Sequence, residues 1–571
     1  MLLGACGPAG SPATPAPMPT AGTVGPETDV ETLLAGLDVR DRIAQLVMPF
    51  IPGTYAAYDD AGFERAEAWV DSLHVGGVIV SVGSPLDIAA KLNRLQVRSG
   101  LPLLVGSDLE GGTSLRFNGG TLLPPNMGVG ATGSDSAAYD LGRITALEGR
   151  AVGVQLAFAP VADVNNNPAN PIINTRAFGE DPAEVGRLVA AEVHGLQDNG
   201  MLATAKHFPG HGDTGTDSHL ALPVIGSTWA RLDSVELVPF RAAIAAGVDV
   251  VMSAHIALPG IDPGPLRPGT VAANILTGIL RDSLGFKGLI VTDALNMAGV
   301  ADAYGAEAGV RAFLAGADLL LQPADPRAAI DAMARAIDRG EITMARLDAS
   351  VRRVLELKRR LGLFTRRTVA LDSIPAIVGN AAFQADAASL AARSLVLVKD
   401  SAGVVYGLPR GPAGLTLVSY GEEENRTAGI ALASELRAQG FAVTLARLWP
   451  ASGAASYDSA AAAGDRPPGR ARGAHRPRRA RAAHRPRLAR QPVRDRRAAG
   501  GRVVSHRLAL ERRDRAGGGA GPRGRGAHHR PPADRAAAVV PARLGVAAPG
   551  AVATSTPLTR DSRCISSSPT G

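Results

Sequence analysis

Cysteine, aromatic residues and long apolar runs are all scarce in this chain of 571 residues. The two cysteines, Cys6 and Cys564, lie near opposite ends, so neither a disulfide framework nor a cysteine-based metal cluster can be built from them. Aromatic residues make up 4%, and no run of about 18 apolar residues suggests a membrane-spanning helix. A hydrophobic content of 46% is still ample for a core, in a few domains or in one large barrel with a smaller unit.

A net positive charge is also absent from most of the chain, although the formal net charge of the whole chain is +7. Residues 465–571 hold 25 Arg, no Lys and 6 acidic residues, a charge of +19 that leaves −12 for residues 1–464. The folded part therefore offers no support for a basic groove that binds nucleic acid. We interpret residues 465–571 as a disordered, low-complexity basic tail that arises from a shifted reading frame. A polyanion-binding tail is the alternative.

The N-terminus carries a short motif of its own. Leu3-Gly4-Ala5-Cys6 resembles a bacterial lipobox, and residues 7–28 are rich in Pro, Ala, Gly and Thr, as a flexible linker would be. The charged region and most of the apolar region of a signal peptide do not precede it. We expect a start upstream of Met1 and an extracytoplasmic protein whose only membrane attachment is a lipid anchor on Cys6. An ordinary disordered N-terminus is the alternative.

Eight short apolar runs recur along the chain, with helix-forming stretches between them. The runs are continuous rather than alternating, which is typical of parallel strands that are covered on both faces. They lie at 44–50, 77–80, 102–106, 154–160, 201–205, 248–253, 288–291 and 317–321. The intervening stretches have apolar spacing near 3.6, including 137–152, 182–199, 234–246, 271–284 and 304–314. This alternation predicts an α/β fold with a (β/α)8 TIM-type barrel.

The remaining elements suggest how the chain divides into domains. Helices at 326–339 and 344–361 would close a barrel that spans 29–365. Strand-like segments then follow at 394–398, 415–419 and 442–445, with a helix at 422–439. We interpret 366–464 as a truncated α/β sandwich domain, which lies between the barrel and the basic tail.

Polar side chains follow five of the eight predicted strands. Because chemistry in such barrels takes place at the carboxyl ends of the strands, these side chains are expected to meet at one mouth. They are Asp108, Glu110, Asp163, Lys206, His207, His255 and Asp293. The densest stretch is Lys206–His219, with three histidines, three glycines and two aspartates. A polar surface loop with incidental histidines is one interpretation, and a catalytic loop is the one that we favour.

Four ordered motifs within about residues 30–460 resemble glycoside hydrolase family 3, in particular its bacterial β-N-acetylhexosaminidase branch. The motifs are Asp108-Leu109-Glu110-Gly111-Gly112, Arg176-Ala177-Phe178-Gly179-Glu180-Asp181-Pro182, Lys206-His207-Phe208-Pro209-Gly210-His211-Gly212-Asp213-Thr214 with Asp217-Ser218-His219, and Thr292-Asp293. The sequence departs from the family at Thr113, where the family usually has Arg. This departure bears on fine substrate preference rather than on the chemistry.

The resemblance implies a role for each matching residue. Asp293 would be the nucleophile of a retaining mechanism, since a carboxylate can form a glycosyl ester. His219 would act as general acid and then as base, oriented by Asp217. Gly210, Gly212 and Gly215 would let this loop move toward the leaving oxygen. Five residues would bind the sugar: Asp108, Arg116, Arg176, Lys206 and His207.

Glu110, Asp163 and His255 have weaker claims, as groups that support the sugar-binding residues or fix loops. A salt bridge that holds the barrel mouth is the alternative role for Arg176 and Lys206. No cofactor and no metal are implied, because His207 and His211 are separated by a Pro-Gly break that prevents helical pairing.

The expected function is a retaining exo-β-N-acetylglucosaminidase that acts on peptidoglycan fragments or chitooligosaccharides. A family 3 β-glucosidase-type enzyme and a glycoside phosphorylase are alternatives. The histidine acid/base leaves phosphorolysis open, since a neutral imidazole repels phosphate less than a carboxylate does. A non-catalytic, sugar-binding surface lipoprotein is an alternative of another class. The presence of Asp293, Asp217 and His219 together argues against it.

Overall fold

The computed structural model describes residues 29–57, 60–218, 220–401, 403–408, 414–421 and 427–464. These residues belong to two compact units, which divide between Val398 and Lys399. Cys6 with its lipobox-like motif, His219 and the basic tail 465–571 lie outside the described residues. None of the described helices is both long enough and apolar enough to cross a membrane.

The first unit is built on short parallel strands that pair in a continuous order. They are β1 (Val47–Met48), β2 (Phe50–Ile51), β3 (Gly77–Val80), β4 (Leu104–Ser107), β5 (Leu156–Ala157), β6 (Thr204–Phe208), β7 (Val250–Ser253), β8 (Leu289–Val291) and β9 (Leu320–Leu321). Sheets β2-β3-β4-β5, β6-β7-β8 and β1-β9 are joined by bridges from Leu156 to Leu202 and from Val291 to Leu319. The order therefore runs from β2 through β8 to β9 and β1. Because β1 and β2 follow each other directly in the chain, the ring of strands is closed, as in a TIM-type barrel.

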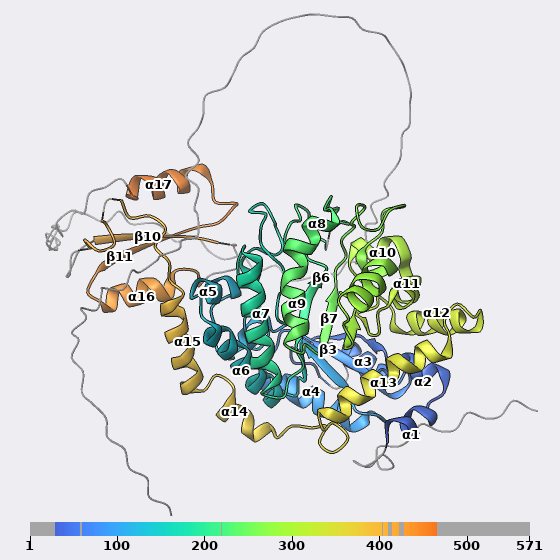
Figure 1. Ribbon diagram of the computed structural model, residues 1–571. Coiled ribbons are helices and arrows are strands. Elements are labelled where there is room, and N and C mark those ends of the chain that lie inside the picture. Colours follow the sequence, from blue (N-terminus) through green and yellow to red (C-terminus); the bar gives the residue numbers. More distant parts are fainter. Residues whose placement is uncertain are drawn as a thin grey trace, which may run out of the picture. The chain divides into compact units, whose positions relative to one another are not determined.

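Helices cover the outside of these strands (Figure 1). They are α1 (Val30–Ala35), α2 (Val39–Ala44), α3 (Ala61–Asp71), α4 (Pro85–Arg98), α5 (Asn126–Ala131), α6 (Asp135–Val152), α7 (Pro182–Gln197), α8 (Trp229–Arg231), α9 (Leu237–Ala245), α10 (Ala298–Tyr304), α11 (Ala308–Ala315), α12 (Pro326–Asp338), α13 (Met344–Arg360), α14 (Ile374–Ile377) and α15 (Ala381–Arg393). Segments Leu232–Glu236 and Asn274–Ser283 are π-helical. Short 3₁₀ turns occur at Thr113–Leu115, Asn174–Arg176, Gly269–Val271, Gly305–Glu307 and Leu371–Ser373. α6, α7 and α9 pack side by side.

Local sequence explains where the long outer helices begin. The Asp181 carboxylate accepts a hydrogen bond from the Glu184 amide at 2.9 Å, and Pro182 occupies the first turn of α7. α4 and α12 begin in the same way, with Ser or Asp as the capping residue and Pro after it. Such caps satisfy amides that have no partner within the helix, and proline is favoured where its missing amide costs nothing.

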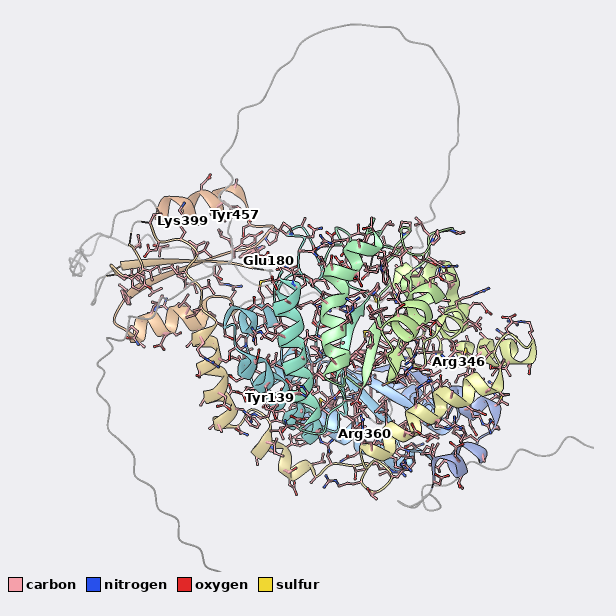
Figure 2. All side chains as sticks on the ribbon, in the orientation of Figure 1. Tyr139, Glu180, Arg346, Arg360, Lys399 and Tyr457 are labelled. Carbon is pink, nitrogen blue, oxygen red and sulfur yellow. The ribbon has the colours of Figure 1, made fainter. Side chains whose placement is uncertain are left out.

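Burial explains why the predicted strands could be recognised from their apolar runs. Each of the eight runs overlaps a strand of the closed pairing order, and every residue of β3, β4, β7 and β8 is buried. Side chains fill the space between these strands and the helices around them (Figure 2). The strands are therefore covered on both faces, as their continuous apolar character predicts.

The second unit contains one β-α-β segment in the part of the chain that the structure describes. β10 (Gly414–Tyr420) pairs in parallel with β11 (Ala442–Leu448), and α16 (Ile430–Ala438) connects them before α17 (Ala454–Gly464). The strands predicted at 415–419 and 442–445 are therefore present.

The strand predicted at 394–398 is wrong. This segment has no regular structure, and Leu395 is 74% exposed. Apolar residues of high β propensity form a strand only where a neighbouring strand pairs with them, and no strand in the described part of the chain pairs with this segment.

Candidate active site

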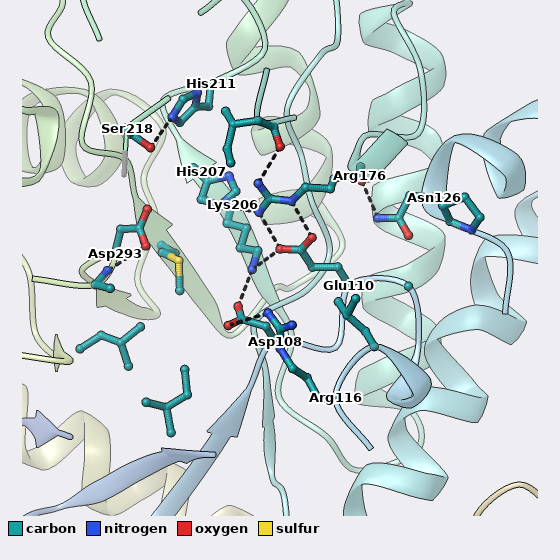
Figure 3. Close-up of a pocket in the computed structure, with 18 of the residues that line it drawn as sticks. Asp108, Glu110, Arg116, Asn126, Arg176, Lys206, His207, His211, Ser218 and Asp293 are labelled. Atoms are coloured by element: carbon teal, nitrogen blue, oxygen red, sulfur yellow. Dashed lines mark hydrogen bonds and ion pairs between the residues drawn. The ribbon is translucent and has the colours of Figure 1, made fainter. Parts of the chain in front are cut away.

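The polar residues at the strand ends meet around one cavity of about 790 Å³. Figure 3 shows them converging from several elements of the first unit. The lining includes six of the eight residues predicted from sequence: Asp108, Arg116, Arg176, Lys206, His207 and Asp293. Asp217 is half-buried beside Ser218, which also lines the cavity. His219 lies outside the described residues.

A buried network of ion pairs forms one wall of the cavity. The Lys206 ammonium lies 2.9 Å from Asp108 Oδ1 and 2.6 Å from Glu110 Oε1. The Arg176 guanidinium donates two hydrogen bonds to Glu110, at 2.7 and 2.8 Å. Burial alone would raise the pKa of Glu110, but Lys206 and Arg176 outweigh it and hold this pKa well below its usual range. Glu110 is therefore charged at neutral pH, as is Arg176, whose pKa is raised.

The same network keeps Lys206 protonated. Burial would lower the pKa of its ammonium, but the neighbouring Asp108 and Glu110 carboxylates raise it overall. The Asp108 side chain remains 30% exposed, so its second oxygen can still accept hydrogen bonds from a ligand.

A local irregularity in β6 brings two successive side chains to the same cavity. In a regular strand the side chains of Lys206 and His207 would point to opposite faces of the sheet. The register between β6 and β7 shifts between Ala205 and Phe208, and both Lys206 and His207 line the cavity. The Lys206 ammonium and the His207 imidazole can therefore both contact a ligand in this cavity.

Asp163 fixes His207 and the start of the loop that follows it. Its buried carboxylate lies 2.8 Å from His207 Nδ1 and accepts from the amides of His207 and His211 at 3.2 and 2.7 Å. A carboxylate can only accept, so His207 Nδ1 carries a proton that faces Asp163. On the other side of the ring, Arg176 Nη2 lies 3.3 Å from His207 Nε2.

Asp293 follows β8 and faces the cavity from the side opposite the ion-pair network (Figure 3). Its Oδ1 accepts from the Ala294 amide at 2.8 Å. Burial would raise the pKa of this carboxyl, but His255, His207, the Ala294 amide and Lys206 together lower it. His255 Nε2 lies 3.0 Å from the Ala294 carbonyl, so its proton points there. Asp293 is therefore held as an anion, which is the form that a nucleophile requires.

Residues 38–357 match the model of the glycosyl hydrolase family 3 N-terminal domain, which is more than half of the chain. The chain belongs to glycosyl hydrolase family 3. A β-N-acetylglucosaminidase/β-glucosidase of Cellulomonas fimi is 38% identical over 342 residues, which are 58% of this chain and 61% of that relative. The chain thus spans about three fifths of the length of this relative.

Two solved structures are similar to this chain in fold and sequence. A β-N-acetylglucosaminidase of Paenibacillus sp. str. FPU-7 has a TM-score of 0.66 at 33% identity, and the match covers 75% of this chain and 82% of that one. The β-glucoside phosphorylase BglX bound to 2FGlc has a TM-score of 0.68 at 29% identity, covering 75% and 78%.

Two asparagines that were not predicted from the sequence also support the site of this family 3 chain. Asn170 donates from Nδ2 to the carbonyls of His211 and Gly212, both at 2.9 Å, and so anchors the loop from outside it. Four asparagines within residues 165–170 were a signal for such a role. Asn126 lines the cavity and donates to the Arg176 carbonyl at 2.8 Å.

Thr113, where the sequence departs from the family pattern, faces away from the cavity. It is buried and donates to the Glu148 carboxylate, which also accepts from the Thr121 amide at 3.1 Å and from the Gly379 amide at 2.7 Å. Thr113 therefore fixes the loop after β4. Among the described residues, no group of three or more His, Cys, Asp or Glu side chains could hold a metal ion.

Proposed function

We propose that the protein is a retaining exo-β-N-acetylglucosaminidase that hydrolyses terminal β-N-acetylhexosamine from peptidoglycan fragments or chitooligosaccharides. One observation carries the proposal: an ionised Asp293 faces a charged network of Asp108, Glu110, Arg176 and Lys206 across one cavity. A non-catalytic sugar-binding site has no need of this nucleophile. The names of the Cellulomonas and Paenibacillus relatives support the choice of sugar.

In the first chemical step, the Asp293 carboxylate attacks the anomeric carbon and forms a glycosyl ester. The glycosidic C–O bond breaks, and the leaving oxygen takes a proton from His219, which Asp217 orients. In the second step His219 removes a proton from water. The resulting hydroxide equivalent attacks the anomeric carbon, releases the sugar and returns Asp293 to its ionised form.

The ion-pair network would hold the terminal sugar in place. The Asp108 side chain is partly exposed, so its carboxylate can accept from sugar hydroxyls, and charged acceptors discriminate strongly between ligands. Arg116, which lies 3.7 Å from Asp108, and Arg176 can donate to other hydroxyls. Because Glu110 fixes both Lys206 and Arg176, these donors are positioned before a sugar binds.

The decisive experiment measures turnover of 4-nitrophenyl N-acetyl-β-glucosaminide by the full chain and by its Asp293→Ala variant. We expect wild-type turnover and a loss of at least about 10³-fold in kcat for the variant, with its fold retained by circular dichroism. If both proteins are folded and bind N-acetylglucosamine but neither turns the substrate over, the sugar-binding lipoprotein becomes the better explanation.

A glycoside phosphorylase is the second candidate, because BglX, a β-glucoside phosphorylase, shares the fold over 75% of this chain. The two activities differ in the acceptor that releases the sugar from Asp293. A hydrolase gives free N-acetylglucosamine at a rate that does not depend on inorganic phosphate. A phosphorylase gives the sugar 1-phosphate, at a rate that rises with phosphate concentration.

We also propose that the protein is extracytoplasmic and attached to the membrane by a lipid on Cys6. The support is the lipobox-like sequence Leu3-Gly4-Ala5-Cys6. When the gene is expressed with its natural upstream DNA, the wild-type protein should be found in the membrane fraction and Cys6→Ser should not. Equal partition of the two proteins would refute the anchor.

The second unit is, in our proposal, part of an α/β sandwich domain that a shifted reading frame interrupts near Asp465. The β10-α16-β11 segment and the abrupt loss of Lys, Asn, Met and aromatic residues support this. Sequencing the coding DNA beyond the codon for Ala463 tests it. Apolar, strand-forming sequence in another frame is expected, and its absence would favour a genuine basic tail.

A further inference from the structure

His211 lies in the middle of the loop after β6, and both of its ring nitrogens contact hydroxyl groups. The residue is buried, its Nδ1 lies 2.8 Å from Thr214 Oγ1, and its Nε2 lies 3.0 Å from Ser218 Oγ. Figure 3 shows the contact with Ser218 at the edge of the cavity. The His211 backbone is fixed by two hydrogen bonds: its amide donates to the Asp163 carboxylate, and its carbonyl accepts from Asn170 Nδ2. The ring thus connects the fixed base of the loop to Ser218.

The hydrogen-bond pattern determines which nitrogen carries the proton. The Thr214 hydroxyl donates to the His211 carbonyl at 3.1 Å, so its oxygen accepts from Nδ1–H. Nε2 then has a free lone pair, which accepts from the Ser218 hydroxyl. A protonated ring could not accept this bond.

The electrostatic surroundings of His211 favour the neutral ring. Burial, and after it the nearby His207, with ring centroids 5.9 Å apart, lower its pKa to about 4. The Asp163 and Asp293 carboxylates act in the opposite direction but do not compensate. His211 is therefore neutral and able to accept from Ser218 throughout the neutral pH range.

Ser218 lies between the two residues to which the proposed function assigns proton transfer, Asp217 and His219. It is only 2% exposed and lines the cavity. On its other side, the Asp217 carbonyl accepts from the amides of Leu220 and Ala221 at 3.1 and 3.2 Å, which turns the chain back. The Ser218 hydroxyl is thus where this segment attaches to the base of the loop.

We propose that His211 is a positioning residue for the general acid/base catalysis of the proposed function: its Nε2 holds Ser218, the residue that directly follows Asp217, at the cavity. The inference rests on the proposed glycosidase function. It assigns His211 no contact with the sugar and no proton transfer of its own. Loss of the His211–Ser218 bond should therefore impair proton delivery to the leaving oxygen while leaving the Asp293 attack intact.

The leaving group of the substrate separates this role from a general packing role. The leaving oxygen of a phenyl glycoside must be protonated by a general acid, whereas 2,4-dinitrophenolate is a good enough leaving group to depart without protonation. For Ser218→Ala we expect kcat/KM to fall by about 10–100-fold with phenyl N-acetyl-β-glucosaminide, and by less than about 3-fold with the 2,4-dinitrophenyl compound. With the latter, kcat and KM should fall together, because hydrolysis of the glycosyl ester still needs the base.

Two further variants act as controls. Ser218→Thr keeps the hydroxyl and should recover most of the activity toward the phenyl substrate. Thr216→Ala removes a hydroxyl from an exposed position of the same loop and should behave as wild type with both substrates. An equal loss with both substrates in Ser218→Ala, or no loss at all, would overturn the positioning role. A wild-type protein that turns over neither substrate would instead refute the proposed function.

Discussion

At the scale of single residues, Glu110 is the group on which the ion-pair network of the cavity depends. It contacts both Lys206 and Arg176 and is 7% exposed. Glu110→Gln leaves Arg176 without a carboxylate partner and Lys206 with Asp108 alone. We expect KM to rise by about 10-fold or more and stability to fall by about 2–3 kcal/mol, less than for a fully buried pair because the Arg176 side chain is 30% exposed.

An exposed ion pair provides the control for this prediction. Arg187 contacts Asp135 on the surface, where the two side chains are 42% and 58% exposed. Asp135→Asn should leave KM unchanged. It should change the free energy of unfolding by no more than about 1 kcal/mol. Steady-state kinetics and urea denaturation measure both effects. If Glu110→Gln changes as little as Asp135→Asn, the network does not organise the site.

The burial of Lys358 leads to a separate prediction, which concerns how the free energy of unfolding depends on pH. It is fully buried on α13, its ammonium donates to Gln45 Oε1 at 2.7 Å, and burial lowers its pKa to about 7 from 10.5. Between these two values the unfolded chain binds more protons at this site than the folded one. Its contribution to the free energy of unfolding should therefore rise with pH from 7 to 10.5, by up to about 4 kcal/mol.

Lys358→Met removes this titration. The difference in unfolding free energy between wild type and variant should therefore depend on pH across the window, with the variant relatively most favoured at pH 7 and below. Lys287→Met, at an exposed position, should give a difference that does not vary with pH. A constant difference for Lys358→Met as well would show that this lysine is not held in its neutral form.

At the scale of elements, the glycines of the loop after β6 differ in what they require. A Cβ on Gly212 would lie 1.7 Å from the Val164 carbonyl oxygen, whereas one on Gly215 would meet nothing within 4 Å. Gly212→Ala should therefore displace the loop, lower stability by about 1–3 kcal/mol and reduce kcat/KM by at least about 10-fold. Gly215→Ala, the matched control, should be close to wild type in both measurements. Equal effects would mean that general loop flexibility, rather than close packing at Gly212, is what the glycines provide.

The elements also show what the sequence could and could not predict. Strands covered on both faces, such as β4 and β7, appear as continuous apolar runs, and a polar residue after such a run marks a strand end. The partners that fix the loop could not be read in this way. Asp163 and Asn170 lie more than 40 positions before the groups that they contact, so only the closed arrangement of strands brings them together. The 394–398 error has the same origin, because strand formation depends on a partner that composition does not reveal.

At the scale of the whole molecule, the two units differ in how much core they have. Nearly all buried apolar residues belong to the first unit, whereas Ala433 and Ala460 are the only buried residues described after Lys399. Every side chain of β10 and β11 is at least partly exposed. A two-stranded sheet with so little burial is marginally stable in water. We therefore expect the second unit to open locally long before the first unfolds.

Peptide-level hydrogen exchange measures this difference directly. The amides of β6, β7 and β8 are in buried strands, so they should exchange only through large-scale unfolding. The amides of β10 and β11 should exchange at least about 100-fold faster, because little buried area opposes their opening. Exchange of α13, a long helix of the first unit with a buried face, is the reference for slow behaviour (Figure 2). Protection of β10 and β11 equal to that of β6–β8 would contradict the prediction and would mean that another part of the chain or a second molecule covers these strands.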